Sequence, residues 1–121
     1  MTFNEFDDIC TSYGLRHQYM HGVMTFYLFS HPIFGSSEGL LIKYMADPTG
    51  AHVYLYDKLI PCRNLTPYYY TDEDRMVHLK DLTESQLTDF LDNRMRTFDE
   101  LLPKVEQASI RLSTSQLSEL L

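Results

Sequence analysis

The sequence predicts an α+β fold: an antiparallel three- to four-stranded meander sheet, with an N-terminal helix and a long C-terminal helix packed on one face. Two patterns carry this prediction. Over residues 82–105, apolar residues recur every three or four positions, which is the spacing of one face of an α-helix. Over residues 18–60, apolar residues alternate or run together between turn residues, which indicates strands.

The first helix is predicted over residues 2–14. Thr2 can cap it, and Glu5 can reach back to the Thr2 amide, which makes a capping box. Gly14 stands where a left-handed residue commonly ends a helix. Cys10 falls on the apolar face of this helix, so we expect it in the core.

Three strands are predicted next, over residues 18–30, 40–46 and 52–60. The first is apolar in both of its alternating sets, which is typical of a central strand covered on both faces. Gly22 within it indicates a bulge or a close backbone approach. Residues 75–79 are a candidate short fourth strand.

The turn between the second and third strands is Asp47-Pro48-Thr49-Gly50, in the order that a type I turn prefers. A two-residue loop here would place Ile42 opposite Leu55 and Tyr44 opposite Val53. A bulged turn would shift the pairing by one residue, and the sequence leaves both registers open.

The long helix is predicted from a second capping box, Thr83 with Gln86. Its apolar stripe should lie on the sheet, through Leu87, Leu91, Phe98 and Leu102. Pro103 lacks an amide proton and disfavours a helical residue before it. We therefore expect a kink there, or a helix that ends near Leu102 with another turn starting at Pro103.

The size of the chain, 121 residues with 44% hydrophobic residues, fits one domain over residues 1–108. Residues 109–121 are expected to form a tail, either frayed or folded as a short helix. Two cysteines are too few for a disulfide scaffold, and no window approaches the roughly 20 apolar residues of a membrane span. We expect a cytoplasmic protein that folds without disulfide, metal or cofactor and does not bind membranes.

The net charge of −7 disfavours direct binding of nucleic acid, which normally requires a basic surface. Residues 71–106 hold ten acids and five bases, so much of the negative charge lies around the long helix. An acidic inhibitor that imitates nucleic acid is a second hypothesis. Arg94, Arg96 and Lys104 interrupt the acids and count against it.

Two motifs resemble sites but lack their context. Residues 35–39, with Ser37 at the centre, match the G-x-S-x-G motif of hydrolases, yet a strand rather than a helix follows. His17 and His21 have the spacing of a helical zinc pair. In a strand their rings would lie about 13 Å apart, too far to share an ion.

Two further patterns are weaker still. Arg63 could activate the Cys62 thiol with His52 or His78 as base, but nothing in the sequence brings these residues together. Residues 72–74, Asp-Glu-Asp, lack the glycine and distal glutamate of a calcium loop. We expect no catalytic residue and no metal site.

The stretch Tyr68-Tyr69-Tyr70 is the best candidate for a binding surface. Because side chains alternate in extended chain, the three rings cannot all face one core. Exposed tyrosines beside an arginine, here Arg63, are typical of protein-binding surfaces. The alternative is an aromatic edge packed over the end of the sheet.

A homodimer is expected through the sheet face away from the helices. Depending on register, this face carries either Tyr27 and Phe29 or the alternate set of Met24, Phe26 and Leu28, joined by Tyr54 and Tyr56. Such a patch would exceed what monomers usually expose, and a second copy would cover it. Residues 109–121 folding back over the patch is the competing explanation.

Together these features favour a non-catalytic protein-binding or regulatory accessory module, and the small size suggests a bacterial or phage cytoplasm. The alternatives are the acidic nucleic-acid mimic and a sensor that holds a small apolar ligand between sheet and helix. A deep polar cleft would favour an enzyme instead.

Overall fold

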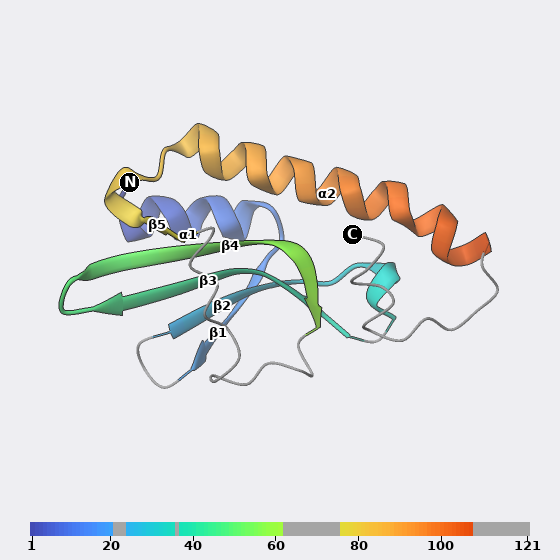
Figure 1. The fold of residues 1–121 in the computed structure, drawn as a ribbon, viewed down its shortest axis with the longest axis horizontal. Helices are drawn as coiled ribbons and strands as arrows, with labels where there is room; N and C mark the ends of the chain where they lie inside the picture. The colour runs from blue at the N-terminus through green and yellow to red at the C-terminus, as the bar shows by residue number, and fades with distance from the viewer. Residues whose placement is uncertain (21–23, 36, 62–75, 108–121) are drawn as a thin grey trace.

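The computed structural model describes residues 1–20, 24–35, 37–61 and 76–107. Its elements, in chain order, are α1 (Phe3–Ser12), β1 (Arg16–Met20), β2 (Met24–Phe29), the 3₁₀ turn η1 (Pro32–Phe34), β3 (Gly39–Asp47), β4 (Gly50–Pro61), β5 (Met76–His78), the 3₁₀ turn η4 (Leu79–Asp81) and α2 (Glu84–Gln107). The strands form one antiparallel sheet in the order β1-β2-β3-β4-β5. Figure 1 shows α1 and α2 on the same side of this sheet, as the sequence predicts.

The sheet has one strand more than expected because residues 18–30 do not form a single strand. They belong to an antiparallel hairpin, in which Arg16 pairs with Leu28 and Met20 with Met24. The side chains of residues 16–19 are exposed, as on an edge strand, whereas four consecutive residues of β2 are buried. The two-sided apolar pattern therefore belongs to β2 alone, and Gly22 lies outside the described residues.

The hairpin between β3 and β4 has the two-residue loop, with Asp47 opposite Gly50. Ile42 pairs with Leu55, and Tyr44 pairs with Val53, which settles the register that the sequence left open. The candidate fourth strand is present as β5, which pairs with β4 at the edge of the sheet.

Helix α1 begins at the predicted capping box. The Thr2 hydroxyl accepts from the Glu5 amide, and the Thr2 amide donates to Glu5 Oε1, both at 3.2 Å. The helix ends with Gly14 at φ +79°, and the Leu15 amide donates to the Cys10 carbonyl at 3.2 Å. These contacts satisfy backbone groups that a helix end would otherwise leave unpaired.

Helix α2 also begins at its predicted capping box, since the Thr83 amide donates to Gln86 Oε1 and the Gln86 amide to the Thr83 hydroxyl. It then continues through Pro103 to Gln107, so it does not end at Leu102. A proline so near the end of a helix removes only one of its last backbone hydrogen bonds. Leu102 is half-buried, and Leu101 instead faces the core.

Both faces of the sheet carry buried side chains. On the helix side, Tyr27 packs edge-on against Phe6 at 5.1 Å between ring centroids, and the Tyr27 hydroxyl donates to Asp7 at 2.8 Å. This larger core includes Leu87, Leu91 and Phe98 of α2. A smaller cluster on the opposite face is made of Phe26, Leu28, Leu40 and Tyr56.

One glycine of the sheet is required by close packing. A Cβ atom at Gly39, the first residue of β3, would overlap the ring of Phe34 from η1. That ring in turn meets Phe98 of α2 edge-on, with ring centroids 5.2 Å apart. The start of β3, η1 and α2 are therefore held in one contact.

Replacing Leu91 with alanine should lower the free energy of unfolding by about 2–5 kcal/mol, because the change leaves a cavity under α2. Leu102→Ala removes the same atoms from a half-buried position and should cost less than half as much. Urea unfolding followed by circular dichroism measures both. Equal costs would mean that the buried face of α2 is assigned wrongly.

Candidate functional site

An open groove of about 540 Å³ lies between the first half of α2 and the β4–β5 edge of the sheet. It is lined by Leu55, Asp57, Val77, Leu82, Gln86, Asp89, Phe90 and Asn93. This volume falls within the range of sites that hold small molecules. Figure 1 shows α2 running over β4 on the helix side of the sheet.

The periods of the two elements bring these residues together. On β4 the side chains alternate, so Leu55 and Asp57 share the helix-facing side. On α2 the lining residues are three or four positions apart and so lie along one side of the helix. Leu82 and Phe90 are buried, whereas Gln86 and Asn93 are exposed. The groove therefore has an apolar floor and a polar rim.

Arg94, close to this groove, is buried, although the sequence pattern groups it with the exposed bases that interrupt the acids of the long helix. Its side chain is 4% exposed, and its guanidinium lies 4.9 Å above the Phe98 ring. Nε and Nη2 are buried without a hydrogen-bond partner. Burial lowers the pKa of Arg94, and the charge of Asp57 opposes this shift. The spacing in the sequence indicates that Arg94 lies on the buried side of the helix, because position 94 is three residues after Leu91 and four before Phe98.

Burial of Arg94 changes the charge that α2 presents. Its exposed acids are Glu84, Asp89, Asp92, Asp99, Glu100 and Glu106, and its exposed bases are Arg96 and Lys104. The outer surface of the helix thus carries six acids against two bases. It is more acidic than the sequence suggests, because one of the three interrupting bases faces inward.

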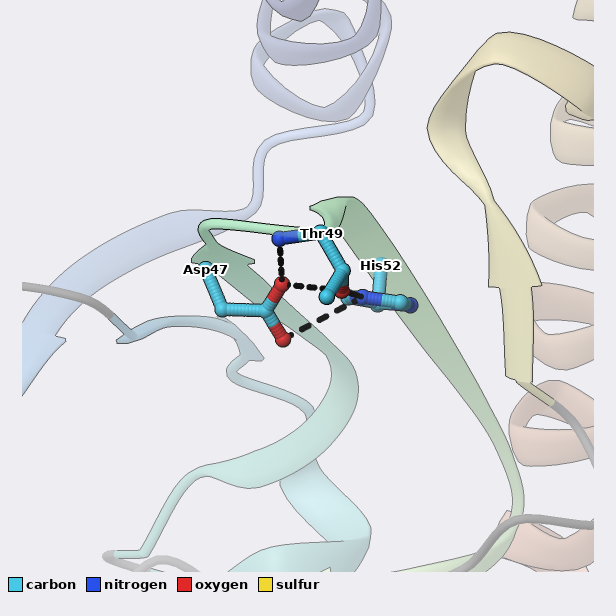
Figure 2. Close-up of polar contacts among 3 residues, drawn as sticks. All are labelled: Asp47, Thr49 and His52. Atoms are coloured by element: carbon cyan, nitrogen blue, oxygen red, sulfur yellow. Dashed lines mark hydrogen bonds and ion pairs between the residues drawn. The ribbon is translucent and has the colours of Figure 1, made fainter.

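A second polar cluster lies at the β3–β4 turn, where Figure 2 shows Asp47, Thr49 and His52 in contact. The Thr49 amide and hydroxyl both donate to Asp47 Oδ1, at 2.8 and 2.5 Å. His52 Nε2 lies 3.3 Å from Asp47 Oδ2. The two Thr49 bonds, aided by His52, lower the pKa of Asp47. Because the Thr49 proton is directed to Asp47, the hydroxyl is not activated by His52, and the cluster stabilises the turn.

Ser37, at the centre of the G-x-S-x-G match, lines a hollow of about 360 Å³ together with His31. His31 Nδ1 accepts from the Ile33 amide at 3.2 Å, so the ring proton of the neutral imidazole is on Nε2, which lies 3.1 Å from Asp99 Oδ1. A serine nucleophile needs a base with one nitrogen available to the hydroxyl. Both nitrogens of His31 are engaged, so it cannot serve Ser37 in this arrangement.

Of the remaining sequence candidates, the structure describes four. His17 is exposed on β1, and the rings of His52 and His78 lie 4.8 Å apart on β4 and β5. Cys10 is buried in the core, and burial raises the pKa of its thiol well above the usual value. The other candidates lie outside the described residues: His21, Cys62, Arg63, Tyr68, Tyr69, Tyr70 and residues 72–74.

The four residues expected at a dimer interface do not share one face. Tyr27 and Phe29 lie under the helices, where Phe29 stacks on Phe98 at 5.8 Å between ring centroids. Tyr56 belongs to the opposite face, and Tyr54 packs against the same cluster. Within the described part of the chain, Tyr19 on β1 is the one large hydrophobic residue that is exposed.

Among the described residues, no group of three or more His, Cys, Asp or Glu side chains is arranged to hold a metal ion. No helix within the described ranges is both long and apolar enough to cross a membrane. Comparison of the chain with protein-family models, curated proteins and solved structures finds no match.

Replacing Arg94 with methionine should raise the free energy of unfolding by about 1–3 kcal/mol, because a buried cation with unsatisfied nitrogens costs more than an apolar side chain of similar length. Chemical denaturation measures the change. Arg96→Met, on the exposed side of the same helix, is the control and should stay within about 0.5 kcal/mol. A less stable Arg94→Met protein would show that the guanidinium is net stabilising.

The Asp47 contacts predict a specific acid dependence. A carboxyl whose pKa is lowered on folding stabilises the protein above its ordinary pKa of 3.8, and this contribution is lost as the pH falls through the folded value. The melting temperature of the protein should therefore exceed that of Asp47→Asn at neutral pH, and the gap should close below pH 3.8. Asp8→Asn, on α1, makes the same charge change as a control. A gap that does not depend on pH would contradict the assignment.

Proposed function

We propose that this protein is a non-catalytic binding module that holds a segment of a partner protein in the groove between α2 and the β4–β5 edge. The observation that carries the proposal is the groove's combination of an apolar floor with a polar, solvent-facing rim. Peptide-binding sites commonly pair an apolar anchor pocket with polar groups that fix the backbone.

The rim is suited to peptide backbone. Asn93 and Gln86 carry side-chain amides, which can both donate to carbonyls and accept from amides. Gln86 Oε1 already accepts from the Thr83 amide, which holds this side chain in place at the start of α2. A pre-positioned side chain loses less conformational entropy when a partner binds.

The polar clusters elsewhere support the non-catalytic part of the proposal. The Thr49 hydroxyl is committed to the β3–β4 turn, and His31 is committed to the Ile33 amide and Asp99. Each cluster thus has a structural role that accounts for its hydrogen bonds.

The homodimer stays a prediction. The prediction of a dimer requires that the sheet face opposite the helices be apolar and exposed. On that face, however, Phe26, Leu28 and Leu40 are each at most 1% exposed in a single chain. A second copy on this face would gain less apolar burial than the sequence suggests. The groove is therefore the better-supported surface for a partner.

Selection of peptides from a random displayed library on the whole protein tests the proposal. We expect selected peptides to bind the native protein and to lose at least about tenfold in affinity for Asn93→Trp, because the indole would fill the groove. Ser85→Trp is the matched control, since it places the same side chain on an exposed position of α2 outside the groove. Fluorescence anisotropy with labelled peptides measures both. Failure to select any peptide, or equal binding to Asn93→Trp, would overturn the proposal.

A further inference from the structure

We infer that the segment held in the groove is basic, with a lysine or arginine reaching the acidic rim while apolar groups lie on the floor. This inference rests on the proposed function, because it names the chemistry of the partner at the same site. It starts from the charges around the groove.

The groove residues carry two carboxylates, Asp57 and Asp89, and no cationic side chain is among the described residues that line it. The half of α2 that borders it, residues 84–95, has three exposed acids, Glu84, Asp89 and Asp92, and no exposed base. The chain as a whole has a net charge of −7. The groove, the adjoining part of α2 and the chain as a whole are all negatively charged. Each would repel an acidic segment and attract a basic one.

Arg94 does not offset this charge at the groove surface. Its side chain is buried among the contacts of α2 with the sheet, and it is not part of the groove lining. Asp57 lies close enough to Arg94 to favour the charged form of the guanidinium. Part of the field of Asp57 is therefore directed inward, so Asp89 should contribute more than Asp57 to the attraction of a cation.

The floor suits the same kind of side chain. Lysine and arginine have long apolar stems that can lie on apolar surface while the charged group stays in water. Here the stem would lie along Leu55, Val77 and Phe90, and the charged group would reach the rim. The Phe90 ring offers a cation a further favourable contact if the stem crosses its face.

Three variants that each remove one negative charge distinguish attraction of the peptide by the groove carboxylates from attraction by the overall charge of the protein. Asp89→Asn and Asp57→Asn change the groove, whereas Asp8→Asn makes the same change on the exposed side of α1. Binding of the selected peptides to Asp89→Asn should weaken about two- to fivefold, as expected for a solvent-exposed charge pair. Asp8→Asn should leave affinity unchanged. Asp57→Asn removes the negative charge near the buried Arg94, so the melting temperature of this variant must be measured first. If Asp57→Asn is unfolded, the result for Asp89→Asn alone decides the question.

The sequences of the selected peptides provide a second test of the inference. Selected sequences should be enriched in lysine and arginine relative to the unselected library, and substitution of those residues with norleucine, an uncharged side chain with a similar apolar stem, should weaken binding. Affinity should also fall as the salt concentration rises. Neutral or acidic peptides that lose binding to Asn93→Trp would overturn this inference and leave the groove proposal standing. Basic peptides that bind Asn93→Trp and Asp89→Asn as well as the native protein would overturn both.

Discussion

The contact between α2 and the sheet is the interaction on which the rest of the structure depends. The apolar stripe of α2 packs with Phe6 of α1, Tyr27 of β2 and Val53 of β4. One face of this helix therefore covers the core that α1 and the strands build. The same packing forms the groove, because the first half of α2 lies opposite Leu55 and Asp57 of β4 and Val77 of β5. Stability and the candidate binding surface are thus two results of one helix orientation.

That contact also includes a costly residue. A guanidinium within an apolar helix–sheet interface loses its hydration, and two of its nitrogens find no partner to replace water. Its neighbours, the Phe98 ring and the charge of Asp57, compensate in part. Departures from good packing of this kind concentrate near functional sites, and here the departure lies one helical turn from the groove residue Phe90.

Much of the fold follows from short-range signals that the sequence displays openly. The capping boxes at Thr2 and Thr83 depend on neighbours within a few residues, and both are confirmed. The turn after Asp47 was placed by the same kind of signal, but its two-residue loop was one of two registers that the sequence left open. The division of residues 18–30 into two strands was missed, because Tyr19 and Met20 of β1 continue in sequence the apolar pattern of β2. The groove was not predictable in this way. It forms where residues about 35 positions apart, such as Leu55 and Phe90, meet across two elements, and no local sequence pattern indicates such a contact.

The contact of Gly39 with Phe34 makes one backbone position in β3 responsible for a distant helix. Any side chain at position 39 must displace the Phe34 ring, and the ring cannot move without disturbing its edge-on contact with Phe98. Variation at these three positions should therefore be linked: a larger residue at 39 becomes tolerable only alongside a smaller one at 34 or 98. Related chains should change these sites together or keep all three, even though positions 39 and 98 are about half the length of the chain apart.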